Sequence, residues 1–245
     1  MRAMVLAAGL GTRLRPLTSD RPKALVEVAG RTLLELTLGR LRSFGICEVI
    51  INTHHFADMV AEYLAEHQNF GMHIEISREE VLLDTGGGLK KAQHFFLGSD
   101  EPFLVHNVDV LSTIDFQSLI HFHQQHGALA TLAVQDRATS RYLLFDENGR
   151  LCGRRAGLTG APELVCPAAS FQARAFCGIH VLSPGIFSKM QEEGVFSVIR
   201  TYLNLASRKE PVLGFAASGC YWRDLGHREQ IAQASQEINE AIYPY

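Results

Sequence analysis

The stretch that decides the fold is Met1–Lys23, MRAMVLAAGLGTRLRPLTSDRPK, at the start of a chain of 245 residues. Its apolar run, Met4–Ala8, breaks off at Gly9 and Gly11 and is followed by basic residues such as Arg13. Small residues let backbone N–H groups approach a phosphate closely, and basic side chains neutralise its charge. An ordinary strand-to-helix turn also needs glycine. The added Arg, Pro, Thr and Lys favour a buried strand that ends in a phosphate-binding loop.

Two commoner phosphate loops are excluded. The dinucleotide fingerprint requires a third glycine where Leu14 stands, and the Walker A loop requires Gly-Lys-Ser/Thr after its glycines. The pattern that fits is Gly-x-Gly-x-Arg-x-x-Pro-x-Thr followed by Pro-Lys. In these residues the chain resembles the sugar-1-phosphate nucleotidyltransferases; they are Gly9, Gly11, Thr12, Arg13, Pro16, Thr18, Pro22 and Lys23.

This resemblance implies that the loop wraps a nucleoside triphosphate. Arg13 and Lys23 would be the catalytic cations on its phosphates. The nucleotide-binding residues that it implies here are Ala7, Ala8, Gly9, Gly11 and Thr12.

Composition narrows the class of protein. A hydrophobic fraction of 47% and a charged fraction of 20% are those of a globular protein. The net charge of −3 argues against a general nucleic-acid binder, so phosphates must meet a local cluster of cations. The first strand follows Met1 directly and no apolar stretch reaches the roughly 20 residues of a membrane span, so we expect no signal peptide, no membrane segment and a cytoplasmic location. The five cysteines lack CxxC spacing, which argues against a zinc site or a disulfide framework.

Short apolar runs alternate with amphipathic stretches in the first half, which predicts a parallel sheet covered by helices. Strands are expected at 3–7, 48–52, 72–77, 102–107, 128–134, 141–145, 151–154, 173–182 and 212–216, and helices at 32–44, 56–67, 88–96, 115–126, 197–207 and 227–241. Residues 157–170 read as a loop. The predicted fold is α/β: a Rossmann-like, mixed, mainly parallel sheet between helices, of the nucleotide-diphospho-sugar transferase type. We expect one domain over 1–245, with a nucleotide-binding part at about 1–135 and a sugar-phosphate part at about 136–245.

Three consecutive glycines follow Asp84 and Thr85 and precede a predicted helix. Glycine loses more conformational freedom on folding than any other residue, so three in a row indicate either a flexible turn or close approach of the backbone to a flat ligand. In the family that the chain resembles, a Thr-Gly-Gly segment lies against the nucleobase, which implies this role for Thr85, Gly86 and Gly87. The TGGG form most resembles the N-acetylmuramate-1-phosphate uridylyltransferases.

Two aspartates are the candidate magnesium ligands. Asp109 follows a very apolar predicted strand, and Asp224 lies in the segment Trp222–His227. Either one alone would more often be a turn or helix-cap residue. The resemblance places a metal-binding Asp at both positions, although Val108 and His227 replace the family's usual glycine and threonine. Together the two carboxylates form a hard oxygen site of the kind that Mg²⁺ needs when phosphates supply its other ligands.

The sugar side carries weaker signals. The family's Glu-Lys-Pro segment is missing, and Arg141, Arg154 or Arg155 could replace its lysine, although a solvated surface position is the simpler interpretation of each. Gly178 matches a small residue that leaves room for the sugar, or is a strand bulge. Asn107 completes the candidate sugar-binding set.

The resemblance implies nucleotidyl transfer from an NTP to a sugar 1-phosphate, with release of pyrophosphate. UTP with N-acetylmuramate 1-phosphate is the favoured pair. GTP with mannose 1-phosphate or a heptose 1-phosphate is the first alternative. A non-catalytic nucleotide or sugar-phosphate sensor on the same fold is an alternative of another class. Retention of Arg13, Lys23, Asp109 and Asp224 favours the enzyme.

Overall fold

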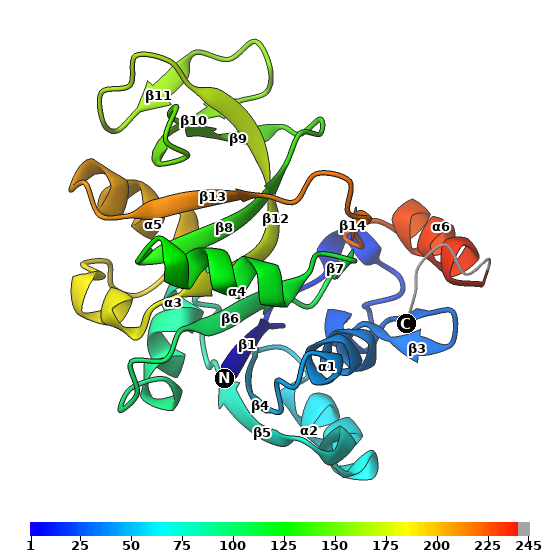
Figure 1. The fold of residues 1–245 in the computed structure, drawn as a ribbon. Helices are drawn as coiled ribbons and strands as arrows, with labels where there is room; N and C mark the ends of the chain where they lie inside the picture. The colour runs from blue at the N-terminus through cyan, green and yellow to red at the C-terminus, as the bar shows by residue number, and fades with distance from the viewer. Residues whose placement is uncertain (240–245) are drawn as a thin grey trace.

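The computed structural model describes residues 1–239, which fold around one large mixed sheet (Figure 1). Its parallel part has the order β6-β1-β4-β5. The strands are β1 (Arg2–Leu6), β4 (Glu48–Thr53), β5 (His73–Arg78) and β6 (Phe103–Asn107). The predicted parallel first half is therefore confirmed, with strand boundaries within about one residue of those expected.

The second half extends the sheet mostly by antiparallel pairing. The long strand β12 (Gln172–Leu182) is antiparallel to β6, to β8 (Ala130–Gln135) and to β9 (Arg141–Phe145). The predicted hairpin is present between β9 and β10 (Leu151–Ala156), which project at one end of the molecule in Figure 1. Further strands are β11 (Pro162–Leu164), β13 (Val212–Ala216), and the two small pairs β2 (Glu27–Val28) with β3 (Arg31–Thr32) and β7 (Val110–Ser112) with β14 (Trp222–Asp224).

The expected loop over 157–170 is wrong in one part, because β11 lies within it. Its three residues are exposed and pair with β10 at Gly153, Arg154 and Arg155. This edge strand is held in place by backbone hydrogen bonds to β10. Its side chains show no apolar pattern. A sequence rich in Gly, Pro and Ala gives no periodic signal for such a strand.

Helices cover both faces of the sheet. They are α1 (Leu33–Ser43), α2 (Ala57–Glu66), α3 (Asp84–Lys91), α4 (Phe116–Gln125), α5 (Val198–Ser207) and α6 (Arg228–Asn239), with short 3₁₀ turns at Thr12–Leu14, Lys23–Leu25, Gln68–Gly71, Ala92–Phe95 and Pro184–Lys189. Along β1, Ala3 and Val5 join one hydrophobic core and Met4 joins the other. Because side chains alternate across a strand, β1 is buried on both faces, as expected of a central parallel strand.

Local capping explains where three of the predicted helices begin. The Thr32 hydroxyl accepts the N–H of Glu35 at 3.0 Å, Asp115 accepts that of Gln117 at 2.9 Å, and Ser197 caps α5 in the same way. These side chains satisfy N–H groups that the first helical turn leaves without partners. The predicted C-terminal helix is confirmed as far as Asn239, and its last two expected residues lie outside the described part.

Helix α3 begins four residues earlier than the sequence indicated, at Asp84. The glycine run therefore lies inside the helix. A Cβ on Gly86 would come within 2.4 Å of the Phe196 ring, and one on Gly87 within 2.3 Å of the Gly194 carbonyl oxygen. Glycine is needed here so that α3 can pack closely against the segment 194–196, and this packing outweighs its poor helix propensity.

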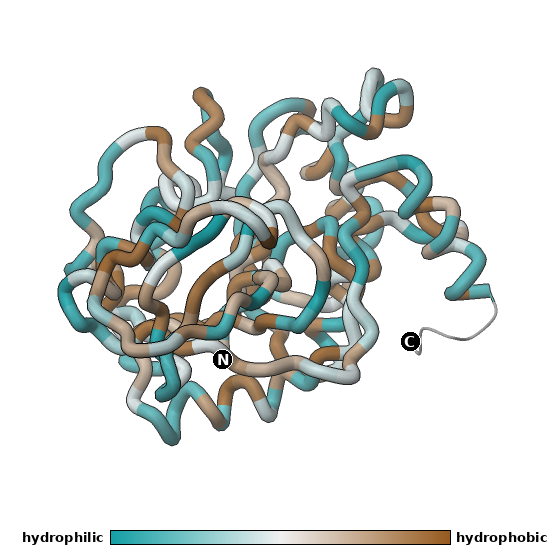
Figure 2. The backbone as a smooth tube through the Cα atoms, turned by 90° about the horizontal axis from the view of Figure 1, so that it is seen from above, coloured by the Kyte–Doolittle hydropathy of each residue, from teal (hydrophilic) through white to brown (hydrophobic). Residues whose placement is uncertain are grey.

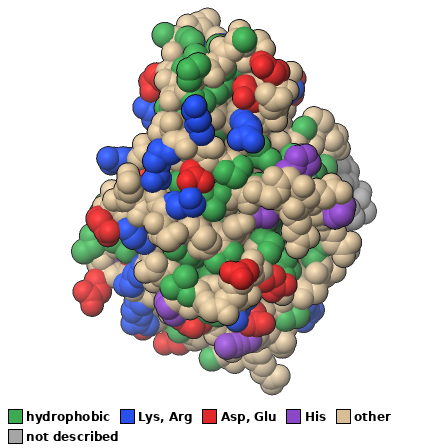
Figure 3. Space-filling view, turned by 60° about the vertical axis from the view of Figure 1, so that its left-hand side comes forward, with side chains coloured by type: hydrophobic (Ala, Val, Ile, Leu, Met, Phe, Trp, Pro, Cys, Tyr) green, Lys and Arg blue, Asp and Glu red, His purple; other side chains and the backbone are tan. Residues whose placement is uncertain are grey.

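Hydrophobic and charged residues are distributed as a layered fold requires. Figure 2 shows hydrophobic segments alternating with hydrophilic ones along the peripheral helices, which is the pattern of amphipathic elements. On the face in Figure 3, Lys and Arg side chains gather along one side, so the net charge of −3 conceals local positive clusters. Within residues 1–239, no helix is long and apolar enough to cross a bilayer.

Candidate active site

A cleft of about 380 Å³ lies where the parallel strands end. The register of the sheet puts Leu6 opposite Asn52 of β4 on one side and Asn107 of β6 on the other. The carboxyl ends of three adjacent strands thus meet at one point, where ligands bind in open α/β sheets. The lining residues are Leu6, Ala7, Ala8, Gly9, Lys23, Asn52, Leu82, Asp84, Thr85, Asn107, Val108, Asp109 and Val195.

The predicted phosphate loop forms one wall, and its two glycines serve different purposes. Gly11 has a left-handed φ of +62°, and a Cβ there would approach Thr18 Cγ2 to 2.9 Å, so the fold itself requires glycine. The Thr18 hydroxyl donates to the Gly11 carbonyl at 2.8 Å and closes the loop. A Cβ on Gly9 would meet nothing within 4 Å. Gly9 therefore leaves space on the cleft side and is not needed for packing.

Lys23 and Asp109 form an ion pair at the floor of the cleft. Lys23 is 8% exposed, and the Asp109 side chain is 19% exposed. The N–H of Val108 donates to the Leu6 carbonyl at 3.1 Å, which fixes the turn that carries Asp109 beside the phosphate loop. Val108 itself is buried in the core, so the fold accommodates it in place of the family's usual glycine. The two predicted residues are thus brought together, with opposite charges in contact.

The second predicted carboxylate joins this pair through the backbone. Strand β14 is antiparallel to β7 with Asp224 opposite Val110, and the N–H of Leu225 donates to the Asp109 carbonyl at 2.7 Å. The Arg223 Nε donates to Glu237 of α6 at 3.0 Å and so anchors β14. Asp109, from the middle of the chain, and Asp224, from its last quarter, are thus brought close together through the backbone.

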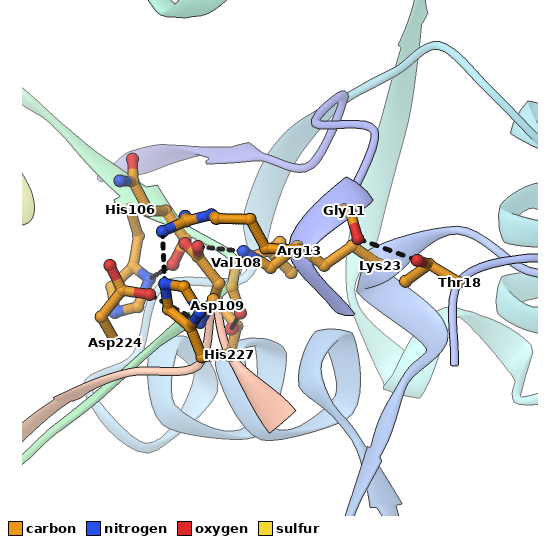
Figure 4. Close-up of polar contacts among 12 residues, drawn as sticks. Gly11, Arg13, Thr18, Lys23, His106, Val108, Asp109, Asp224 and His227 are labelled. Atoms are coloured by element: carbon orange, nitrogen blue, oxygen red, sulfur yellow. Dashed lines mark hydrogen bonds and ion pairs between the residues drawn. The ribbon is translucent and has the colours of Figure 1, made fainter. Parts of the chain in front are cut away.

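Arg13 reaches across to the same segment (Figure 4). Its Nη1 lies 2.8 Å from His227 Nε2, and a Cβ on Gly226 would come within 2.7 Å of Nη2. The Asp224 carboxylate accepts the N–H of Gly226 at 2.6 Å, which tightens the turn under the guanidinium. Sequence reasoning identified His227 only as a replacement for threonine. The structure shows that it contacts Arg13.

A buried polar network behind the cleft was missed by sequence reasoning. Asn52 accepts the N–H of Ala7 at 2.8 Å and donates to Glu79 at 2.8 Å, and Glu79 accepts the N–H of Leu83 at 2.9 Å. Glu79 is 2% exposed. The network links the start of the phosphate loop to the start of α3. An Asn at the end of one strand and a Glu just after the next one were its only signals in the sequence.

The predicted base-binding segment is only partly at the cleft. Thr85 is among the lining residues, and its hydroxyl accepts the N–H of Val198 at 3.0 Å. The N–H groups of Gly86 and Gly87 both donate to the Phe196 carbonyl, at 2.9 and 3.2 Å. These two glycines are absent from the described lining, and the structure gives them a packing role. Their contact with a base stays a prediction.

Of the predicted sugar-binding residues, some lie at the cleft and others lie away from it on the hairpin. Asn107 lines the cleft and touches Gly178, where a Cβ would come within 2.8 Å of its Nδ2. Gly178 has a φ of +72° at a register shift in β12, so the bulge interpretation is correct and the bulge makes room for Asn107. Arg141 and Arg154 are exposed on the hairpin, and neither is among the described lining residues. Arg154 donates instead to Glu163 at 2.7 Å.

Two buried histidines lie where the parallel and antiparallel halves meet. His106 of β6 precedes Asn107, and its Nδ1 lies 2.8 Å from the Asn107 carbonyl. Burial lowers the pKa of His106 to about 4 and that of His180 on β12 to about 3. Both imidazoles are therefore neutral near pH 7.

The donor set near Arg13 fits a divalent cation that shares its coordination with a substrate. Among the described residues, no group of three or more His, Cys, Asp and Glu side chains could hold a metal by itself. Mg²⁺ binds through one or two carboxylates and takes further oxygens from water and phosphates. Asp109 and Asp224, joined through the β7–β14 pair, supply two carboxylates of this kind, and their role as metal ligands stays a prediction.

Comparison with known proteins identifies the family. The family model described as nucleotidyl transferase matches residues 2–241, so the chain belongs to the nucleotidyl transferase family, a class of enzymes. The N-acetylmuramate alpha-1-phosphate uridylyltransferase of Caulobacter vibrioides is 34% identical over 98% of this chain and 97% of its own length.

Two further relatives extend the comparison. The catalytic subunit beta of mannose-1-phosphate guanylyltransferase from Drosophila melanogaster is 30% identical over 92% of this chain, which spans 59% of that longer protein. The crystal structure of HddC from Yersinia pseudotuberculosis superposes with a TM-score of 0.77 at 21% identity, covering 97% of this chain and 99% of that one. The latter likeness confirms the predicted fold class.

Proposed function

We propose that this enzyme transfers a uridylyl group from UTP to N-acetylmuramate 1-phosphate, giving the UDP-sugar and pyrophosphate. The observation that carries the proposal is the Lys23–Asp109 pair in a cleft with a glycine loop, beside the segment Asp224–His227 that Arg13 contacts. The nearly full-length similarity to a uridylyltransferase named for this sugar supports the choice of substrates.

The reaction needs little covalent chemistry from the protein. A phosphate oxygen of the sugar 1-phosphate attacks the α-phosphorus of the NTP, the new P–O bond forms, and the bond to the β-phosphate oxygen breaks to release pyrophosphate. The attacking oxygen is already anionic, so no strong general base is needed. Catalysis then consists of positioning two anions and stabilising the charge that develops on the leaving group.

Each residue of the site has a role in this scheme. Lys23, held beside Asp109, neutralises charge near the α-phosphate, and the exposed Arg13 stabilises the departing pyrophosphate. Asp109 and Asp224 would hold Mg²⁺, which when bound supplies further charge neutralisation to the phosphates. The backbone after β1 and the side chain of Thr85 border the space for the nucleotide.

A guanylyl transfer to mannose 1-phosphate is the second candidate, favoured by the similarity to mannose-1-phosphate guanylyltransferases over 92% of the chain. Both candidate functions are tested by measuring pyrophosphate release in the presence of Mg²⁺. Each of five NTPs is combined with the 1-phosphates of N-acetylmuramate, mannose and glucose. We expect the fastest release with UTP and N-acetylmuramate 1-phosphate. Preference for GTP and mannose 1-phosphate would establish the second candidate, and nucleotide binding without any release would favour a sensor.

A further inference from the structure

One arginine of the second half, absent from the sequence-based site, lies beside the second aspartate. Arg137 follows β8, and its Cζ lies 3.5 Å from the centroid of the Trp222 ring. Its Nη2 donates to the Phe176 carbonyl at 2.8 Å, and the side chain is half-buried. In the described part of the chain, its Nε has no hydrogen-bond partner and no carboxylate lies within ion-pair distance of its guanidinium.

Several other arginines of this half are already neutralised or exposed, and Arg155 lies farther from its aromatic neighbour, with its Cζ 5.7 Å from the Tyr142 centroid. Arg154 is paired with Glu163 at 2.7 Å, and Arg174 is paired with Asp136 at 3.0 Å. Arg141 is exposed at the start of β9. Arg137 differs from all three, because it is held in place by an aromatic ring and a carbonyl while its charge is left without a carboxylate.

The position of Arg137 connects it to the active site. Trp222 lies two residues before Asp224 on β14, and its Nε1 donates to the Cys177 carbonyl at 2.8 Å. The next residue is Gly178, against which the cleft residue Asn107 packs. Burial lowers the pKa of Arg137, and the negative charge of Asp224 acts in the opposite direction, as two nearby opposite charges do.

We propose that Arg137 binds the phosphate of the sugar 1-phosphate and so replaces the lysine of the missing Glu-Lys-Pro segment. The inference rests on the proposed function. The Nε of Arg137 is buried, so its two Nη groups are the donors left for a phosphate, and stacking on Trp222 fixes their plane before the substrate arrives. The sugar 1-phosphate would then be bound by Arg137 on the Asp224 side of the site, whereas Lys23 and Arg13 bind the phosphates of the NTP.

Kinetics of Arg137→Ala and Arg137→Lys test the proposal. We expect the KM for the sugar 1-phosphate to rise about tenfold or more in Arg137→Ala, with the KM for the NTP within about twofold of wild type, because a charge-assisted contact is lost on one substrate only. Arg137→Lys should recover only part of the loss, since an ammonium cannot reproduce the stacked fork. Equal changes in both KM values, or none, would overturn the proposal.

Arg42→Ala is the matched control. Arg42 Nη1 also donates to a phenylalanine carbonyl, that of Phe70, at 2.8 Å, but it lies at the end of α1 away from the cleft residues. Its removal should leave both KM values unchanged. Thermal unfolding of the three variants shows whether any has lost its fold.

A binding readout separates this inference from the proposed function. Trp222 is the single tryptophan of the chain, so its fluorescence reports on the Arg137 stack. In the presence of Mg²⁺ and a non-hydrolysable UTP or GTP analogue, titration with N-acetylmuramate 1-phosphate and mannose 1-phosphate should change the signal in wild type, with a half-saturation about tenfold higher in Arg137→Ala. A wild-type signal that responds to neither sugar phosphate, or an unchanged half-saturation in the variant, overturns the role of Arg137. Absence of turnover alone would overturn only the proposed function.

Discussion

The two halves of the molecule build their parts of the site in different ways. In the parallel half, the functional residues follow directly after strand ends, as Ala7 follows β1 and Asp109 follows β6. In the antiparallel half, exposed hairpin residues such as Arg154 pair with each other, and Arg137 comes from a loop and depends on a distant tryptophan. Parallel strands that end at one edge place their functional residues at recognisable positions near each strand end, whereas antiparallel extension gives no such rule.

The largest effect is expected at the junction between the halves, for Asp109→Asn. This change removes a candidate magnesium ligand and the partner of Lys23. The loss of comparable electrostatic groups lowers kcat by about 10²–10³-fold. Pyrophosphate release measured over a range of MgCl₂ concentrations should show this loss, together with a higher Mg²⁺ requirement.

Asp58→Asn provides the control for that substitution. The Asp58 side chain is 79% exposed and pairs with Arg78 on the surface, where such pairs contribute about 0–1 kcal/mol. Its turnover should match that of wild type. If Asp109→Asn retained activity within a few-fold of wild type while remaining folded, the assignment of Asp109 would be wrong.

The different construction of the halves explains what the sequence could predict. The loop at Gly9–Lys23 and Asp109 were recognisable because motif and strand end coincide, and Asp224 was recognisable from its motif alone. The structure brings Arg13, Asp109 and Asp224 to one region. Arg137 gave no local signal, because its environment is created by β14, which pairs with β7 only in the folded chain. The glycines of α3 were misplaced, since the packing against Phe196 that overrides their propensity is a tertiary contact.

The next largest effect is expected from acidification, which should lower the stability of the protein where the two halves meet. His106 of β6 and His180 of β12 lie on adjacent strands, and burial lowers their pKa values to about 4 and about 3. The unfolded chain, with histidine pKa values near 6.5, binds protons that the folded chain excludes. Their contribution to stability is therefore complete above about pH 6.5 and falls by about 1.4 kcal/mol per histidine for each pH unit below it.

Urea unfolding between pH 7.5 and 4.5 measures this loss. In His180→Gln the free energy of unfolding should fall less steeply with decreasing pH, because one of the two buried histidines is removed. A wild-type stability that stayed constant down to pH 4.5 would contradict the assignment of these imidazoles as neutral and buried.

Gly86→Ala should affect folding more than binding. The added Cβ would lie 2.4 Å from the Phe196 ring and 2.9 Å from the Phe196 carbonyl oxygen, so the segment that packs on α3 has to shift. Overpacking of this kind costs about 1–3 kcal/mol. For a protein of this size, each kcal/mol lowers Tm by about 2–4 °C, which thermal unfolding can measure.

Gly9→Ala should have the reverse outcome of Gly86→Ala, changing binding more than folding, and it has the smallest effect that we expect. Nothing lies within 4 Å of a Cβ at Gly9, so Tm should stay close to that of wild type. The methyl group would instead enter the cleft, where we propose that the loop after β1 approaches the nucleotide phosphates. We expect the KM for the NTP to rise several-fold while that for the sugar 1-phosphate changes little. A fall in Tm as large as that of Gly86→Ala, with unaltered kinetics, would mean that Gly9 serves the fold and leaves the nucleotide unaffected.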